Sequence, residues 1–182
     1  MSAIFPELQT PRLKLRELNE NDADVLFAMH SNYAIMSWYG TDHMIERHDA
    51  IELLAKYRAL RKAPGSGIRW GICSHESPIL LGTCGFQKWN RGWNSCLLRY
   101  DLKVEARGQG YMQEALRSAI IWGFANMNLN RIEAQIHPNN RPSILLIEKL
   151  GFVREGIMRK AGYWDEQYHD LCLYSLLKSD FY

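Results

Sequence analysis

The feature that most restricts the fold of this chain is a change in hydrophobic period close to residue 110. Upstream, apolar and polar residues alternate, as at Ile68, Trp70 and Ile72, which is the pattern of a β-strand. Downstream, apolar residues recur every three or four positions and share one helical face, made of Met112, Ala115, Leu116, Ala119, Ile120, Gly123, Phe124 and Met127. A strand-forming region is therefore followed by a long helix that packs on it.

The same two periods recur along the rest of the chain. A first strand holds Leu13, Leu15 and Leu18, and the polar run 19–22 supplies capping oxygens for a helix that reaches about His30. The other expected elements are a helix around 50–57, strands at 79–89, 96–103 and 132–136, a short helix with Pro142 in its first turn, and two strands within 152–177. No repeat or linker interrupts this order, so we expect one α/β (α+β) domain over residues 1–182.

Composition narrows the possible partners. The chain is 47% hydrophobic and 23% charged with a formal net charge of +2, which favours a soluble globule and gives no support for binding nucleic acid. The four cysteines form no Cys-x-x-Cys pair and no metal-type spacing with histidine, so we expect reduced thiols and no metal. No signal peptide and no uninterrupted apolar run of 18 residues is present, which predicts a cytoplasmic protein without a membrane partner.

The segment from Arg107 to Met112 opens the long helix and is suited to binding a diphosphate. Backbone N–H groups are exposed at a helix N-terminus, where the helix dipole also attracts negative charge. Gly108 and Gly110 permit positive φ angles and let phosphate approach without a Cβ in the way, while Arg107 adds a charged donor. By itself the loop is equally compatible with a tight strand-to-helix connection.

Two other classes of phosphate-binding loop do not match. A P-loop requires Gly-x-x-x-x-Gly-Lys-Ser/Thr, and this string does not occur in the chain. A dinucleotide-binding loop requires Gly-x-Gly-x-x-Gly, but the third residue after Gly110 is Gln113. ATP or GTP hydrolysis and NAD binding are therefore disfavoured.

Four separated segments carry a family resemblance. They are the strand Thr10 to Arg16, the strand Tyr100 to Leu102, the loop 107–112 with Glu114 to Leu116 after it, and the segment Asn140 to Phe152. In this order they resemble the GNAT superfamily of N-acetyltransferases, specifically the branch that acetylates the N-terminal alanine or serine of ribosomal proteins. The resemblance implies a mixed, mostly antiparallel central sheet with about four helices and a splay between the fourth and fifth strands.

The resemblance also implies a co-substrate, acetyl-CoA, whose pantetheine arm pairs with the strand edge that the splay leaves free. The residues expected to bind it are Leu102, Lys103, Val104, Arg107, Gly108, Gln109, Gly110, Tyr111, Met112, Asn140, Ser143 and Leu146. Met112 stands where the superfamily prefers a small residue, and we interpret its side chain as part of the core.

Direct acyl transfer needs a neutral amine, donors for the tetrahedral oxyanion and a proton for the leaving sulfur. Many superfamily members supply that proton from a tyrosine at the position occupied here by Ile147. Ser143 is the candidate catalytic residue for this step, although a role in capping the helix start is equally compatible with it. The oxyanion donor is expected to be a backbone N–H near Leu102 or Lys103.

The sequence identifies no general base. Asp101, Glu105 and Glu133 lie near the expected site but are also compatible with solvated positions, and His137 before Pro138 is also compatible with a structural role. An α-amine titrates near pH 8 and a lysine near 10.4, so a site without a strong base suits an α-amine better. This favours a protein N-terminus as the acceptor.

The acceptor should be framed by the first two helices, their connection and the terminal hairpin, where Trp38, Tyr39, Tyr163 and Trp164 are available. Core packing of these aromatic residues is an alternative. A small amine, such as an amino acid, a polyamine or an antibiotic, is an alternative acceptor and would call for a narrower and more acidic pocket. A non-catalytic acyl-CoA-binding protein is a third hypothesis. We expect a monomer or a homodimer.

Overall fold

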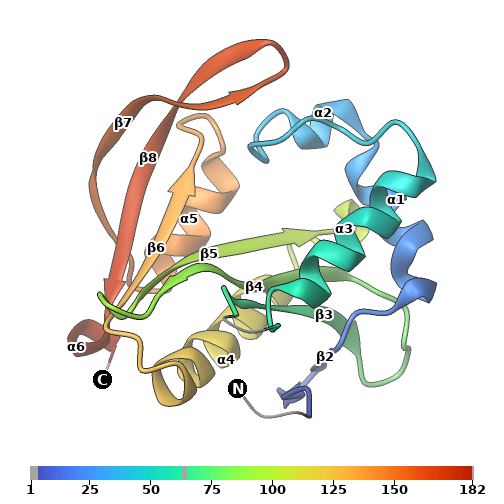
Figure 1. Cartoon of the computed structure of the whole chain (residues 1–182), viewed down its shortest axis with the longest axis horizontal. Helices are drawn as coiled ribbons and strands as arrows, with labels where there is room; N and C mark the ends of the chain where they lie inside the picture. The colour runs from blue at the N-terminus through green and yellow to red at the C-terminus, as the bar shows by residue number, and fades with distance from the viewer. Residues whose placement is uncertain (1–3, 63–64, 182) are drawn as a thin grey trace.

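Alternating apolar residues form the strands of one eight-stranded sheet in the computed structural model, which describes residues 4–62 and 65–181 (Figure 1). The strands are β1 (Leu8–Gln9), β2 (Leu13–Arg16), β3 (Ile68–Ser74), β4 (Gly82–Asn90), β5 (Ser95–Leu102), β6 (Arg131–Ile136), β7 (Val153–Trp164) and β8 (Gln167–Leu177). Their order across the sheet is β1-β2-β3-β4-β5-β6-β8-β7, and β5–β6 is the parallel pair. The mixed, mostly antiparallel sheet expected from the sequence is confirmed.

Helices and short helical turns connect the strands. They are η1 (Glu20–Asp22), α1 (Ala23–His30), α2 (Tyr33–Met36), α3 (Arg47–Ala59), η2 (Val104–Ala106), α4 (Tyr111–Asn126), α5 (Arg141–Lys149) and α6 (Lys178–Phe181). Helices α1, α3, α4 and α5 are the four that the sequence predicts, the first three from apolar periodicity and α5 from Pro142 in its first turn. Within the described part of the chain, no helix is long and apolar enough to cross a membrane.

The helices cover the two faces of the sheet. Strand β3 is buried on both sides: Trp70 belongs to the core under α4 and α5, whereas Gly71 lies against Leu18 and Leu80 in the core under α1 and α3. The predicted apolar face of the long helix is confirmed, because Met112 is 6% exposed and the rest of that face is buried in the larger core. These two layers place α1 and α4 on opposite faces at the same end of β5.

The two parallel strands separate soon after they pair. The β5–β6 ladder runs from Ser95 opposite Arg131 to Leu97 opposite Glu133, after which β5 continues along β4 and β6 continues along β8. The two-residue strand β1 was not expected, so β5 and β6 are the fourth and fifth strands of the sequence-based count. The predicted splay is therefore present, and it leaves one edge of β5 open.

Candidate active site

The loop before α4 has the backbone conformation that an anion-binding turn requires. Gly108 and Gly110 have φ angles of 76° and 77°, as their predicted role demands, and Gly110 is the N-cap of α4. A Cβ built on Gly108 would meet no atom within 4 Å, so the space beside the loop is open. The first N–H groups of a helix have no carbonyl partners within it, and such groups are suited to bind negatively charged oxygens.

A brace from the first strands holds this loop in place. The Arg12 guanidinium lies 2.6 Å from Glu114 Oε2 and also donates to the Gln109 carbonyl at 2.9 Å. The Thr10 hydroxyl donates to Glu114 Oε1 at 2.6 Å, and Arg12 covers the Tyr111 ring at 4.7 Å. The residues between β1 and β2 therefore hold both Gln109 in the loop and Glu114 in the first turn of α4.

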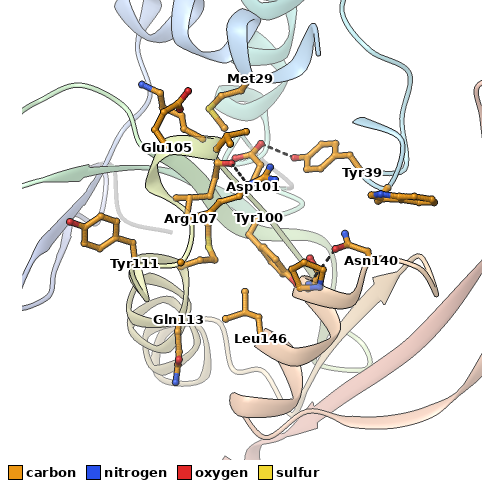
Figure 2. Close-up of a pocket in the computed structure, with 18 of the residues that line it drawn as sticks. Met29, Tyr39, Tyr100, Asp101, Glu105, Arg107, Tyr111, Gln113, Asn140 and Leu146 are labelled. Carbon is orange, nitrogen blue, oxygen red and sulfur yellow. Dashed lines mark hydrogen bonds between the residues drawn. The ribbon is translucent and has the colours of Figure 1, made fainter. Parts of the chain in front are cut away.

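A cleft of about 860 Å³ runs from this loop along the open edge of β5 to α5 and the α1–α2 segment (Figure 2). The predicted co-substrate residues that line it are Leu102, Lys103, Val104, Arg107, Gly108, Gly110, Tyr111, Met112, Asn140, Ser143 and Leu146. Gln109 is not among the lining residues, because its side chain turns back to donate to the Glu105 carbonyl. Arg107 donates through Nε to the Leu102 carbonyl at 3.2 Å.

The pleat of β5 decides which backbone groups face the splay. Lys103 N–H donates to the Leu81 carbonyl at 2.8 Å, so it points toward β4 and is not free to stabilise an oxyanion. Successive backbone groups in a strand point in opposite directions, and Leu102 N–H therefore points to the open edge. The sequence offered Leu102 and Lys103 as backbone donors to the oxyanion. The Lys103 N–H is already bonded to Leu81, so that prediction is wrong, and the Leu102 N–H is the remaining candidate.

Two hydroxyl groups meet where α5 faces β5. Asn140 caps α5 by accepting the Ser143 N–H at 3.3 Å, so the capping role falls to Asn140 and the Ser143 side chain lines the cleft. The Tyr100 hydroxyl is buried near Ser143 but outside hydrogen-bonding geometry with any described residue. Burial raises the pKa of Tyr100 to about 12, an effect that the Ser143 hydroxyl opposes. Ile147 is fully buried, so α5 offers no phenol at that position.

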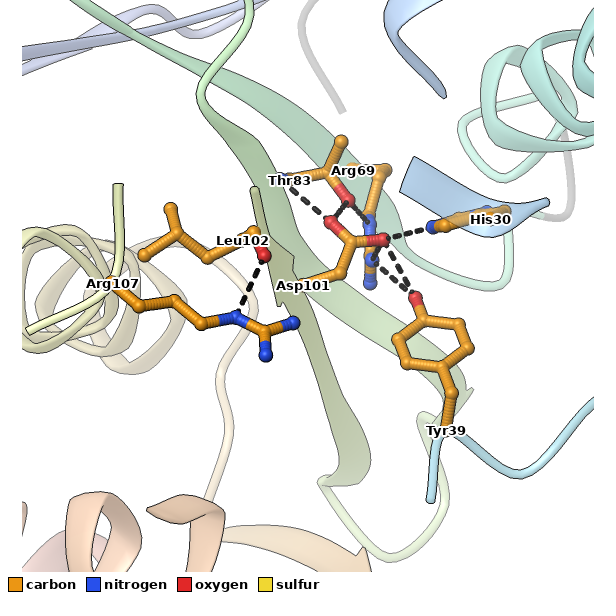
Figure 3. Close-up of polar contacts among 7 residues, drawn as sticks. All are labelled: His30, Tyr39, Arg69, Thr83, Asp101, Leu102 and Arg107. Carbon is orange, nitrogen blue, oxygen red and sulfur yellow. Dashed lines mark hydrogen bonds and ion pairs between the residues drawn. The ribbon is translucent and has the colours of Figure 1, made fainter. Parts of the chain in front are cut away.

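On the other face of β5, Asp101 is the centre of a buried polar network (Figure 3). Its Oδ2 accepts hydrogen bonds from His30 Nε2 and from the Tyr39 hydroxyl, each at 2.8 Å, and lies 3.4 Å from Arg69. Its Oδ1 accepts the N–H and the hydroxyl of Thr83 at 2.8 and 2.5 Å. The Asp101 side chain is 8% exposed, so the solvated position considered from the sequence is wrong.

The network fixes the charge of Asp101. Burial disfavours the ionised carboxylate, but the charge of Arg69 and the hydrogen bonds from His30 and Thr83 outweigh it, so the pKa of Asp101 lies well below its ordinary value. Burial raises the pKa of the Tyr39 phenol well above its ordinary value, and Asp101 adds to that shift. At neutral pH the cleft therefore contacts an ionised Asp101 and a protonated Tyr39.

The four aromatic residues expected to frame the acceptor separate into two groups. Trp38 and Tyr39 line the cleft in the segment that follows α2. Trp164 is 2% exposed and donates its indole N–H to the Ser37 carbonyl at 3.0 Å, so it joins the β7–β8 hairpin to this segment. Tyr163 is 61% exposed and packs on Tyr168, away from the cleft lining.

The remaining candidate bases have other partners or positions. Glu133 forms an ion pair with Arg131 at 2.8 Å. Glu105 lies in η2 and lines the cleft beside the loop. His137 packs on Trp38 with ring centroids 4.5 Å apart. Burial lowers the pKa of His137, and the positive charge of the neighbouring His169 lowers it further. No group of three or more metal-binding side chains occurs among the described residues.

Sequence reasoning missed His30 and Arg69 as site residues. His30 lies seven residues after Ala23 and four after Leu26, on the apolar face of the first predicted helix, and Arg69 lies between two apolar residues of a strand. A polar residue at a predicted buried position signals a buried partner. The sequence therefore indicated that His30 and Arg69 have buried partners, but it did not indicate that Asp101 is the partner of both residues.

An open strand edge beside a helix N-terminus suited to anions is the arrangement that the resemblance to the GNAT superfamily implies. The sequence profile described as "Acetyltransferase (GNAT) domain" matches residues 12–153. An uncharacterized N-acetyltransferase of Bacillus subtilis, YoaA, is 32% identical over 96% of this chain and 98% of its own length. The chain therefore belongs to the GNAT acetyltransferase family, and this membership implies N-acetyltransferase activity.

Relatives and fold neighbours differ in acceptor. The [ribosomal protein uS5]-alanine N-acetyltransferase of Escherichia coli is 31% identical over 64% of this chain and 60% of its own length. A spermidine N-acetyltransferase from Vibrio cholerae, solved in complex with CoA and spermine, superposes with a TM-score of 0.80 at 22% identity over 93% of this chain and 97% of its own. The shared fold therefore leaves the acceptor open.

Proposed function

We propose that this protein transfers the acetyl group of acetyl-CoA directly to a protein N-terminal α-amine. The observation that carries the proposal is the open edge of β5, which follows the pair Leu97–Glu133 and leads to the glycine loop. An added strand can satisfy unpaired backbone groups, and the two amides of a pantetheine arm can do the same. The space beside Gly108 fits a pyrophosphate, since no atom would contact a Cβ there.

The charges along the cleft fit this co-substrate. Lys103, Arg107 and Lys149 line it, whereas its carboxylates are Asp101, which is neutralised by Arg69, and Glu105. A cleft with this balance attracts the phosphates of CoA. Among its described lining residues it offers no free carboxylate at the α1–α2 end, where the acceptor enters, so it does not favour a polycation.

A second, smaller cavity of about 280 Å³ lies behind Tyr39 and contains several carboxylates. They are already engaged: Asp49 accepts the N–H groups of Ile45 and Glu46 at the start of α3, and Glu52 lies 3.7 Å from Lys56. This cavity therefore gives little support to the small-amine alternative, which calls for free negative charge.

The chemistry also separates the acceptors. Near pH 7 about a tenth of an α-amine is neutral, against well under a thousandth of a lysine, and deprotonating the lysine costs about 3 kcal/mol more. Asp101 is the buried carboxylate closest to the reacting end, but its low pKa and its five donors make it a weak base. An acceptor that needs little help to lose its proton suits this site.

The acetyl group lies at the edge of β5 in this arrangement. Leu102 N–H can donate to the oxygen that becomes negative in the tetrahedral intermediate. Ser143 and the unpartnered Tyr100 hydroxyl lie on the α5 side, where the sulfur leaves, and they can hydrogen-bond it. The amine approaches from the opposite face of β5, past Tyr39.

A panel of acceptors tests this proposal. The purified chain is incubated with acetyl-CoA and a peptide that begins with alanine or serine, the same peptide with a blocked N-terminus and an internal lysine, or spermidine, and CoA release is measured. We expect the highest kcat/KM for the free N-terminus, by about tenfold or more, as the amine pKa difference dictates. Turnover of spermidine alone would favour the small-amine acceptor, and CoA binding without any turnover would favour a non-catalytic binder.

A further inference from the structure

We propose that His30 is the catalytic base that takes the proton from the acceptor amine, and that Asp101 is a positioning residue that fixes the orientation and tautomer of His30. The inference rests on the proposed function, because it assigns a step in the same acetyl transfer. It concerns the face of β5 opposite Ser143, where the sequence identified no base.

The fold brings His30 to the reacting end of the cleft. It is the last residue of α1, is 3% exposed, and lines both the main cleft and the cavity behind Tyr39. Its partner Asp101 directly precedes Leu102, whose N–H points to the open edge. Side chains alternate along β5, so Tyr100 faces α5 and the leaving sulfur, while Asp101 and His30 face the incoming amine.

The carboxylate determines which imidazole nitrogen is basic. Asp101 is ionised and already accepts hydrogen bonds from Thr83 and Tyr39, so it can only accept a hydrogen from His30 Nε2 as well. In neutral His30 the hydrogen is therefore on Nε2 and the lone pair is on Nδ1. No hydrogen bond between described residues engages Nδ1, which leaves it available to an amine.

Two groups of negative charge lie next to the His30 ring. Asp101 lies 2.8 Å from Nε2, and the C-terminal end of α1 adds partial negative charge. Arg69 opposes the positive charge, but it lies 3.4 Å from the same carboxylate oxygen, farther than His30 does. The charged and titratable groups on the other elements around the smaller cavity are Tyr39, Asp42, His43, Asp49, Glu52, Lys56 and Tyr57.

The step balances as a single proton moved from nitrogen to sulfur. The amine lone pair forms a C–N bond to the thioester carbonyl carbon, and the C=O π pair moves to oxygen. His30 Nδ1 takes the proton that the nitrogen loses. When the C=O bond re-forms, the C–S bond breaks and its electron pair leaves with sulfur. The thiolate then receives a proton from His30 through water, which gives the amide and free CoA.

The test compares the wild type with His30→Gln, whose side-chain amide can still donate to Asp101 but has no basic nitrogen. We expect kcat on an alanine-starting peptide to fall about 10²- to 10⁴-fold, with CoA affinity unchanged by calorimetry. The matched control is His48→Gln, since His48 is on the exposed face of α3 with a side chain 69% exposed. That variant should keep the wild-type rate.

A second acceptor separates a base from a merely structural residue. In a peptide whose terminal amine is replaced by an aminooxy group, the nitrogen that bonds to the carbonyl carbon is far more acidic and loses its proton to water without a base, so the deficit of His30→Gln should shrink at least tenfold. An equal deficit on both acceptors, or a wild-type rate in His30→Gln, would overturn the role of His30. If the wild type itself acetylates neither peptide, the proposed acceptor fails instead.

Discussion

Arg12 and Glu114 form an ion pair of 2.6 Å that connects the residue before the second strand of the sheet to the first turn of the helix behind the glycine loop. Burial disfavours the charge of Glu114, but the hydrogen bonds from Thr10 and Arg12 outweigh it and lower the pKa of Glu114. The pair is 102 residues apart in sequence, so the anion site is assembled only when the sheet is formed.

Replacing Glu114 with glutamine should loosen the glycine loop. The variant keeps the side-chain size but loses the charge that holds Arg12, so we expect CoA to bind about tenfold more weakly, equivalent to about 1.4 kcal/mol. Calorimetry measures the affinity of the variant for CoA. Glu7→Gln is the matched control, because Glu7 forms an exposed pair with Lys14 and should leave affinity unchanged. Equal CoA affinity in wild type and Glu114→Gln would contradict the bracing role.

Replacing Gly110 with valine should abolish CoA binding. The φ angle of 77° is strained for a branched residue, and the side chain would occupy the approach of the phosphates. The left-handed conformation costs about 1–2 kcal/mol, which the fold should survive. Gly156→Val is the control, because its Cβ meets no atom within 4 Å and Gly156 lies in β7. Wild-type CoA affinity in Gly110→Val would refute the placement of the pyrophosphate.

Replacing Ser143 with alanine tests the leaving-group side. If its hydroxyl assists the departing sulfur, kcat should fall about 10- to 100-fold while the Kd for CoA stays the same, since the lost interaction forms only in the transition state. The helix should remain intact because Asn140 provides its cap. Steady-state kinetics measure the change in kcat, and far-UV circular dichroism checks that the helix is intact. An unchanged kcat would shift this role to the Tyr100 hydroxyl.

Asp101 should contribute a pH-dependent part of the stability. Its folded pKa is lower than the unfolded value of about 3.9, so its stabilisation is complete above that value and is lost as the pH falls below it. Asp101→Asn leaves the buried Arg69 uncompensated and should cost about 3–5 kcal/mol near neutral pH. Urea unfolding between pH 6 and 3 should show a smaller decline for the variant than for the wild type.

Periodicity predicted the elements that are long enough to show it. The face from Met112 to Met127 repeats over four turns, and it is buried as expected. Helices α2 and α6 have four residues each and β1 has two, which is too short for either period to appear. Element boundaries also moved, since the strand expected from Ile79 begins at Gly82.

The parts of the site that depend on adjacent residues could be predicted from the sequence, and the parts that depend on distant residues could not. The glycine loop could be predicted because its conformation depends on adjacent residues such as Gly108 and Gly110. The network of Asp101 could not, because His30 and Arg69 reach it from α1 and β3, 71 and 32 residues away. One sequence shows that a polar residue is buried, but it does not show which residue is its partner.

The most direct measurement locates the acetyl group on a single peptide that carries both a free N-terminal alanine and an internal lysine. The purified protein is incubated with acetyl-CoA near pH 7, and the product is fragmented in a mass spectrometer. The account predicts acetylation of the α-amine with the lysine unmodified. Acetyl groups on the lysine, or an unmodified peptide under conditions in which spermidine is acetylated, would contradict it.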